Sequence, residues 1–365
     1  MKVALVHDLL VQYGGAEKVL KVLEEIYPEA PIFTLVFNEE KMGYFFDKKK
    51  IKTSFLQNLP FGKSAYRWFL SLMPAATEGY DLRDYDLVIS SSSAFAKGAI
   101  TSEQTLHLCY CHTPTRYLWT DTHQYIEGLS YPGLIKKIIP LTLNKLRVWD
   151  YLSAKRPDYF IANSENVRRR IKKFYGRESF VIQPPIEIEK FKISSKLGNY
   201  FLTGGRLVPY KRFDLTIEAF NRLGLPLKIF GTGPEEQKLQ EMAKTNIEFL
   251  GFVSDKNLPE LYSQSLAFIH PQVEDFGITA IEAMASGRPI IAYQAGGALE
   301  SIKNNETGLF FDEQSWEAIL DAILRFKPEN FNPQAIREHA KNFDKEVFKK
   351  RIAEFVKEKW EEFNK

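Results

Sequence analysis

The chain has 365 residues, of which 44% are apolar and 26% charged, a composition typical of a globular protein and not of a disordered or fibrous one. This length predicts two domains of ordinary size. The formal net charge is only +3, which argues against a dedicated nucleic-acid-binding protein. No run of 18 apolar residues occurs, and the apolar start of the chain is too short for a signal peptide, so we expect no membrane span.

Positive charge is concentrated in residues 131–180, which hold 12 Lys/Arg against 4 Asp/Glu. Residues 41–70 also combine lysines with aromatic side chains. Both segments fit contact with an anionic membrane surface, although the first could equally be a solvated face and the second part of a core. The two cysteines, Cys109 and Cys111, are too few for a zinc site, so we expect buried free thiols and a reducing cytoplasm.

The chain opens with a strand, a glycine turn and a helix. Val3–Val6 reads as a short buried strand, Gly14 and Gly15 follow it, and apolar residues then recur at helical spacing to Ile26. Two glycines before a helix let backbone amides approach an anion, although a plain tight turn would look the same. The G-x-G-x-x-G pattern of dinucleotide-binding domains is absent here.

A histidine follows one of the later strands of this half. Its neighbours are polar and aromatic, reading His112-Thr-Pro-Thr-Arg-Tyr-Leu-Trp119. A residue just past the end of a parallel strand lies at the edge where α/β sheets bind ligands, although a lone histidine is often structural. The predicted strands of this half after the first are Ile32–Phe37, Tyr85–Ser93, Leu106–Cys111, Pro157–Asn163 and Phe180–Gln183.

A polar linker beginning at Pro184-Pro185 and reaching about residue 196 precedes a second α/β half. Its first strand runs into a glycine-started loop that carries Arg206 and Lys211, two cations placed to hold a diphosphate. The final forty residues read as helical, with an apolar stripe. The strands predicted for this half are Tyr200–Thr203, Leu227–Phe230, Ile247–Val253, Leu266–His270 and Ile290–Tyr293.

Two glutamates, Glu274 and Glu282, bracket the start of a helix predicted from about Gly277 to Ser286. Eight residues of helix span ~12 Å, which exceeds the separation of paired glycosidase carboxylates. The spacing suits two hydroxyl-rich ends of one ligand with an anion between them at the helix N-terminus, as in a nucleoside-diphosphate sugar. The alternative is a capped helix with two solvated glutamates.

The order of these motifs resembles the GT-B retaining glycosyltransferases of family 4. The resemblance covers nearly the whole chain, and E-x7-E with the loop GGRLVPYKR is its most specific part. It implies an α/β protein of two Rossmann-like domains that face each other across a cleft. The first, residues 1–183 with a returning C-terminal helix at about 345–365, would bind the acceptor. The second, residues 197–344, would bind the nucleotide sugar.

The same resemblance implies roles for individual residues. Arg206 and Lys211 would hold the diphosphate, Glu282 the ribose and Glu274 the hydroxyls of the donor sugar. His112 would contact that sugar near the reacting carbon. The further donor-binding residues would be Gly14, Gly15, Gly231, Val253, Phe276, Gly277, Ile278 and Thr279.

The segment C-H-T-P-x-R-Y-x-W looks like that of bacterial and archaeal mannosyltransferases, which points to GDP-mannose as donor and to a saccharide or lipid-linked saccharide as acceptor. The resemblance implies a retaining, metal-independent transfer without a cofactor, by a cytoplasmic or peripheral enzyme. A sugar-nucleotide epimerase of the same fold and a non-catalytic nucleotide-sugar-binding protein are the alternatives. A dehydrogenase fits less well, because neither glycine loop has the dinucleotide pattern.

Overall fold

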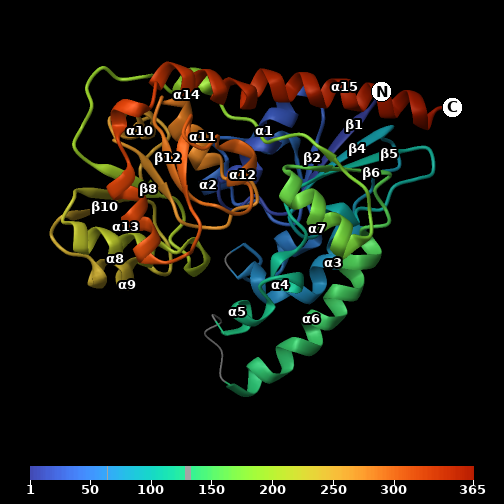
Figure 1. Cartoon of the computed structure of the whole chain (residues 1–365). Coiled ribbons are helices and arrows are strands. Elements are labelled where there is room, and N and C mark those ends of the chain that lie inside the picture. Colours follow the sequence, from blue (N-terminus) through green and yellow to red (C-terminus); the bar gives the residue numbers. More distant parts are fainter. Residues whose placement is uncertain (64, 128–132) are drawn as a thin grey trace. The chain divides into compact units, whose positions relative to one another are not determined.

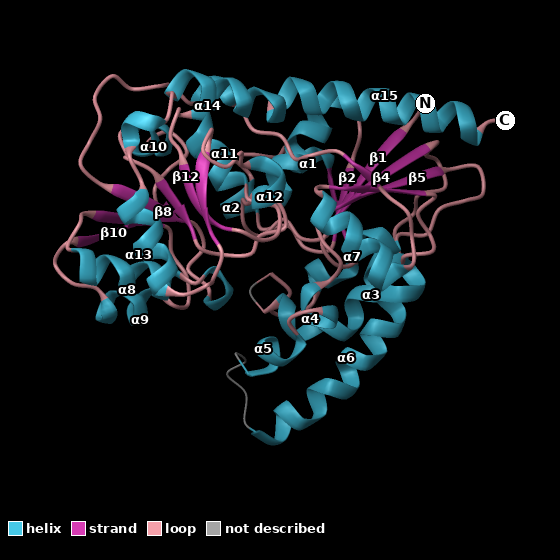
Figure 2. Ribbon diagram, in the orientation of Figure 1, coloured by secondary structure: helices cyan, strands magenta, loops and turns pink. Residues whose placement is uncertain are grey.

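The structure, a computed structural model, describes residues 1–63, 65–127 and 133–365. The chain divides into two compact units, each built on a parallel β-sheet with helices packed against it (Figures 1 and 2). Unit 1 comprises Met1–Gln183 and Phe348–Lys365, and unit 2 comprises Pro184–Val347. The second boundary therefore falls inside the last helix, α15 (Lys345–Phe363).

The described residues of unit 1 form one sheet with the strand order β3-β2-β1-β4-β5-β6-β7. All paired strands are parallel, so their carboxyl ends share one edge. The chain starts in the middle with β1, moves outward to β3 and then returns beside β1 as β4, which makes the β1–β4 pair the point where the direction of winding reverses. The strands are β1 Val3–His7, β2 Ile32–Thr34, β3 Ile51–Thr53, β4 Leu87–Ser92, β5 Leu106–Cys111, β6 Tyr159–Ala162 and β7 Phe180–Val181. The helices are α1 Gly15–Ile26, α2 Glu39–Met42, α3 Met73–Glu78, α4 Arg116–Trp119, α5 Thr122–Glu127, α6 Gly133–Ser153 and α7 Glu165–Tyr175.

Unit 2 repeats this plan with the strand order β10-β9-β8-β11-β12-β13, again with parallel pairs. Here the reversal lies between β8 and β11. The strands are β8 Phe201–Gly204, β9 Leu227–Phe230, β10 Ile247–Gly251, β11 Phe268–His270, β12 Ile290–Tyr293 and β13 Gly308–Phe311. The helices are α8 Phe213–Leu223, α9 Glu236–Met242, α10 Leu258–Ser263, α11 Ile278–Ala285, α12 Ala298–Ser301, α13 Trp316–Arg325 and α14 Pro333–Ala340.

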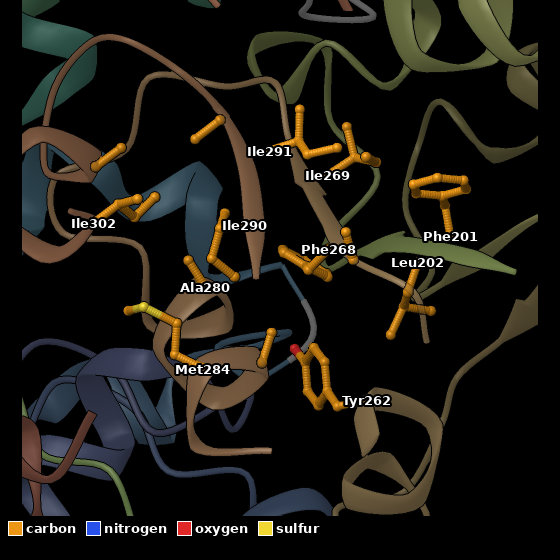
Figure 3. Close-up of a cluster of buried hydrophobic side chains, with 14 of the residues drawn as sticks. Phe201, Leu202, Tyr262, Phe268, Ile269, Ala280, Met284, Ile290, Ile291 and Ile302 are labelled. Carbon is orange, nitrogen blue, oxygen red and sulfur yellow. The ribbon is translucent and has the colours of Figure 1, made fainter. Parts of the chain in front are cut away.

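The core of unit 2 lies on and around its central strands. Helices cover both faces of such a sheet, so its strands read as apolar runs such as Ile290–Tyr293 instead of alternating. Figure 3 shows side chains of this core, with Ala280 and Met284 contributed by α11. The segment predicted as a polar linker also takes part, because Ile186 and Phe191 are buried in the same cluster.

Most predicted strands occur within one to three residues of their expected bounds, but β3 and β13 were missed. Both are edge strands: β3 (Ile-Lys-Thr) is short and carries a lysine, whereas β13 (Gly-Leu-Phe-Phe) is a short apolar run whose periodicity does not distinguish a strand from other structure. β2 is shorter than predicted, because it ends at Thr34 and not at Phe37. Phe37 itself makes only an isolated bridge to Leu10. Residue 64 of the aromatic segment and residues 131 and 132 of the basic segment lie outside the described residues.

Helix α15 returns the chain to unit 1. Phe348, Ile352 and Phe355 recur at helical spacing, and all three are buried in the core of unit 1 beside strands β1, β4 and β5. The apolar stripe recognised in the sequence is therefore a packing face, as the resemblance to the GT-B enzymes implies.

A buried carboxylate ties the end of β1 to the loop after β4. Asp8, the residue after β1, accepts hydrogen bonds from the backbone N–H groups of the four residues 93–96 at 2.6 to 2.9 Å. Four amide donors on one carboxylate satisfy a loop that has no strand partner. This contact holds the two strands on either side of the winding reversal in register at their carboxyl ends.

We expect Asp8→Ala to lower the free energy of unfolding by on the order of 3 kcal/mol, because it leaves buried amides without an acceptor. Urea denaturation followed by circular dichroism would measure the change. Asp84→Ala, which removes an exposed carboxylate from the same unit, serves as the control and should stay close to wild type. Equal midpoints for the two variants would show that the loop is held in another way.

Candidate functional site

The predicted site residues of unit 2 all lie after the carboxyl ends of four of its strands, β8, β9, β10 and β11. In an open parallel sheet this edge, at the reversal of winding, is where ligands bind. The residues are Arg206 and Lys211 after β8, Gly231 after β9, Val253 after β10, and Glu274, Phe276, Gly277, Ile278, Thr279 and Glu282 after β11.

The two predicted cations of the loop after β8 have different surroundings. The short helix η6 (Pro209–Lys211) turns Lys211 back, and its Nζ lies 3.1 Å from Oε1 of Glu274, with both side chains largely buried. Arg206 is exposed, and no hydrogen bond or ion pair ties it to another residue in the described part of the chain. One cation is therefore fixed beside a carboxylate, and the other is open to an incoming anion.

The loops after β8, β9 and β10 touch through their backbones. The N–H of Gly231 donates to the carbonyl of Gly251 at 2.6 Å, and a Cβ on Gly231 would lie 1.9 Å from the carbonyl oxygen of Gly205. Gly231 also has a φ of 106°, a conformation that favours glycine. Val253 lies two residues beyond Gly251 and is half-buried. Only backbone fits at this point, so a ligand there would meet main-chain groups.

Helix α11 starts at the same edge. Gly277, with a φ of 93°, turns the chain from the loop that holds Glu274 into the helix. The first amides of α11 have no acceptor within the helix, and the helix dipole places partial positive charge there. Phe276 is buried and packs on Phe343 with ring centroids 5.4 Å apart, which anchors the loop. The predicted helix bounds are correct to within one residue.

Glu282 is a buried group, only 3% exposed, and it accepts a hydrogen bond from the hydroxyl of Tyr262 at 3.2 Å. Burial and the nearby Glu282 carboxylate together raise the pKa of Tyr262 well above its ordinary value, so the phenol remains a donor. Glu274 meanwhile is paired with Lys211. The alternative interpretation of two solvated glutamates on a capped helix is therefore wrong.

His270, at the end of β11, was not among the predicted site residues. It is fully buried, and neither ring nitrogen has a hydrogen-bond partner among the described residues. Burial, with a smaller contribution from Lys211, lowers the pKa of His270 to about 4. A Cβ on Gly277 would lie 3.3 Å from its Nε2, so the ring packs directly under the start of α11. The sequence signal that could have identified His270 as a site residue is the one used for His112, namely a histidine at the end of a predicted strand.

Unit 1 holds the remaining predicted residues, Gly14, Gly15 and His112. Gly14 is the N-cap of α1, and its N–H donates to Oε2 of Glu17 at 2.8 Å. One of the amides expected to meet an anion is thus satisfied inside the unit, while Gly15 is exposed. These three residues belong to unit 1, whereas the predicted cations and glutamates belong to unit 2.

His112 lies just past β5 and is hydrogen-bonded to the neighbouring strand. Its Nε2 is 2.8 Å from Oγ of Ser91, which in turn lies 3.1 Å from Nδ1 of His7. Burial and the proximity of His7 lower the pKa of His112 to about 3, so its ring is neutral and acts through hydrogen bonds. His7 and Ser91 were not predicted as site residues, although both lie at the carboxyl ends of adjacent strands.

Residues 185–354 match the family described as glycosyl transferases group 1. Two curated relatives are similar over part of the chain. A GDP-mannose-dependent alpha-(1-6)-phosphatidylinositol monomannoside mannosyltransferase of Mycobacterium tuberculosis is 33% identical over 32% of this chain and 35% of its own length. Mannosylfructose-phosphate synthase of Agrobacterium fabrum is 34% identical over 36% of this chain and 33% of its own length. The aligned segments span about a third of these relatives.

Solved structures resemble the chain over almost its full length. HepE from Anabaena, crystallised with UDP, has a TM-score of 0.74 and 19% identity, covering 98% of this chain and 100% of HepE. Sucrose-phosphate synthase from Thermosynechococcus elongatus has a TM-score of 0.76 and 17% identity, and the alignment covers 97% of this chain and 98% of the synthase. At such identities the likeness shows the fold.

Residues 185–354 match the group 1 glycosyl transferases, and the chain has the GT-B fold. Its C-terminal half, residues 185–354, carries the family domain, and the two parallel sheets correspond to the paired Rossmann-like domains of that fold. The fold class and the family resemblance predicted from the sequence are confirmed.

We expect Gly231→Ala to destabilise unit 2 and to disturb the loops after β8 and β10, because the added Cβ meets the Gly205 carbonyl as well as a strained backbone. Gly224→Ala is a matched control, since Gly224 also has a positive φ but has nothing within 4 Å of an added Cβ. The control should lose about 1 kcal/mol from backbone strain alone. Thermal unfolding of both variants measures the difference, and a loss no larger at Gly231 than at Gly224 would contradict the close packing.

Proposed function

We propose that the protein is a retaining hexosyltransferase that moves a sugar, with mannose preferred, from a nucleoside-diphosphate donor to a saccharide or lipid-linked saccharide acceptor. The Lys211–Glu274 pair carries this proposal. It places a cation and a carboxylate side by side at the carboxyl edge of a parallel sheet, directly before the N-terminus of α11. A diphosphate needs the cation and the amides, and a sugar needs the carboxylate.

Donor binding would exchange the partners of this pair. Lys211 would turn from Glu274 to the diphosphate, together with the exposed Arg206, and Glu274 would then accept hydrogen bonds from hydroxyls of the donor sugar. Glu282, held by Tyr262, would accept from the ribose. The amides of Phe276, Gly277, Ile278 and Thr279 would meet the sugar and the phosphates, and the backbone at Gly231 and Val253 would border the base.

The reaction breaks the bond between the anomeric carbon and the leaving phosphate oxygen and forms a bond from that carbon to the acceptor oxygen. Negative charge grows on the departing diphosphate, and Arg206 and Lys211 would neutralise it without requiring a metal ion. Retention follows if the acceptor attacks from the side of the leaving group, with its proton passing to the departing phosphate. Glu274 is then a positioning group and not a nucleophile.

Mannose and GDP are favoured because relatives named for mannosyl transfer from GDP-mannose are similar to about a third of the chain. The HepE structures contain UDP and UDP-glucose, so uridine donors are the main competitor. Thermal unfolding in the presence of GDP-mannose, UDP-glucose and ADP-glucose distinguishes them, because a ligand that binds only the native state raises the unfolding temperature. A higher unfolding temperature with GDP-mannose supports the proposal. A higher unfolding temperature with only one of the other nucleotide sugars would identify that sugar as the donor instead. No change with any of the three would contradict a nucleotide-sugar site.

We expect Lys211→Ala and Glu282→Ala to reduce glycosyl transfer at least a hundredfold, because each removes a charged contact to the donor. Lys228→Ala and Glu248→Ala are the controls, since this pair bridges β9 and β10 on the strands themselves, at 3.3 Å. Turnover and the unfolding temperature are measured on all four variants. Normal turnover in the Lys211 or Glu282 variant would contradict the assigned donor site.

We also propose that unit 1 docks on an anionic membrane surface at the inner face of the cell membrane. Helix α6 presents the exposed apolar side chains Leu141, Val148 and Leu152 to solvent, with exposed Lys137 and Lys145 on the same helix. Such a stripe of apolar and basic residues fits the interface of an anionic bilayer. Within the described residues, no helix has the length and apolar character needed to cross a membrane.

Binding to vesicles of phosphatidylglycerol and phosphatidylcholine should be salt-sensitive and should fall at least tenfold in the triple variant Leu141→Ser, Val148→Ser and Leu152→Ser, because the apolar contact is lost. Leu324→Ser, an equally exposed leucine in unit 2, serves as the control. Co-sedimentation at low and high salt provides the measurement. Absence of wild-type binding at low salt would exclude the membrane surface.

A further inference from the structure

Four buried side chains in unit 1 form one continuous hydrogen-bonded series, Glu17–His7–Ser91–His112, which we call the His7 relay. His7 Nε2 lies 3.4 Å from Oε1 of Glu17, His7 Nδ1 lies 3.1 Å from Oγ of Ser91, and that hydroxyl lies 2.8 Å from Nε2 of His112. All four residues are less than one-tenth exposed. The roles assigned under the proposed function involve none of the four, so the series is unexplained by them.

The sheet brings these residues together where its winding reverses. His7 is the last residue of β1 and is directly paired in register with Ser91 on β4, while His112 follows the next strand, β5. Glu17 reaches the series from the first turn of α1. The relay therefore lies at the edge where a parallel sheet binds its ligand.

If Glu17 acts only as an acceptor and both histidine rings are neutral, the carboxylate sets the direction of every hydrogen bond in the relay. An ionised carboxylate only accepts, and Glu17 already accepts the Gly14 N–H with its other oxygen, so His7 Nε2–H donates to it. In a neutral imidazole the second nitrogen then accepts, so the Ser91 hydroxyl donates to His7 Nδ1. Ser91 Oγ in turn accepts from His112 Nε2–H.

This direction leaves Nδ1 of His112 with a lone pair. The low pKa of His112, a result of burial and the proximity of His7, keeps the ring neutral and so keeps that nitrogen unprotonated. Among the described residues the ring makes its one hydrogen bond with Ser91. Nδ1 is thus an acceptor that a ligand hydroxyl can satisfy.

A second serine–histidine pair on the same two strands lacks these features. Ser90 and His107 are fully buried and bonded at 2.9 Å, but this pair lies near the start of β5, and among the described residues no carboxylate is hydrogen-bonded to the ring. Nδ1 of His107 is buried without a partner. The Ser90–His107 pair is therefore a packed pair inside the sheet. The Ser91–His112 pair differs because it is linked to a carboxylate and lies at the ligand-binding edge.

We propose that Glu17, His7 and Ser91 are positioning residues that hold His112 with Nδ1 as a hydrogen-bond acceptor at the carboxyl edge of the unit 1 sheet, and that this acceptor selects a sugar substrate offering a hydroxyl there over one offering a carboxylate. The selectivity rests on the proposed function, which takes a sugar as substrate. A hydroxyl donates to the lone pair, whereas the oxygens of a uronate repel it. The site therefore selects neutral hexoses against hexuronates.

The direction of the relay is tested without any substrate. Protein labelled with 15N in its histidine rings is examined by NMR, and His112→Gln identifies the His112 signals. We expect Nε2 protonated and Nδ1 unprotonated in the wild-type protein, and loss of this single tautomer in Ser91→Ala, with Ser90→Ala unchanged at His112. A protonated Nδ1 in the wild type, or the same tautomer retained in Ser91→Ala, would overturn the relay.

The selectivity is tested with GDP-mannose and GDP-mannuronate as probes. Ser91→Ala and Glu17→Gln should lower kcat/KM for GDP-mannose by about tenfold and narrow the preference over GDP-mannuronate, whereas Ser91→Thr, which keeps the hydroxyl, should restore both. Ser90→Ala should change neither value. An unchanged preference in Ser91→Ala would overturn the selectivity. Failure of the wild type to use GDP-mannose would count against the proposed donor, while the NMR result would still decide the relay.

Discussion

Parallel strand pairing is the constraint on which both halves of this protein depend. Every strand pair in either sheet is parallel, so all carboxyl ends in a unit share one edge, and the loops that follow them are gathered there. The reversal of winding, at β1–β4 in unit 1 and at β8–β11 in unit 2, brings residues far apart in sequence into contact. His7 faces Ser91 in register, and Lys211 reaches Glu274, only because of this topology.

Polar groups buried at these edges are satisfied in ways that prepare them for a ligand. Asp8 accepts four backbone amides and so holds the loop beyond Ser91 in place. Lys211 and Glu274 neutralise each other, and Glu282 is held by Tyr262. Buried charges without such partners would be costly, which is why Lys211 and Glu274 are held as a pair.

The comparisons and the geometry support different levels of the conclusion. The match to the group 1 family covers residues 185–354, and the GT-B fold rests on structures that align over nearly the whole chain. The proposed sugar and nucleotide rest on relatives aligned over about a third of their length, and on the hydroxyls and phosphates that the paired groups could hold. Specificity within the family would then depend on single atoms, such as Nδ1 of His112.

The amino-acid sequence determined the α/β class, the central strands, the loop with Arg206 and Lys211, and the helix after Glu274, because these rest on local apolar periodicity and on glycine and proline at the boundaries. It did not reveal the edge strands β3 and β13, because β3 is interrupted by a lysine and β13 is a short apolar run without a distinguishing periodicity. Nor did it reveal the contacts of His7, Ser91 and His270, since a buried polar group has meaning only through its partner. Those partners lie on other strands, and only the tertiary structure decides which of them meet.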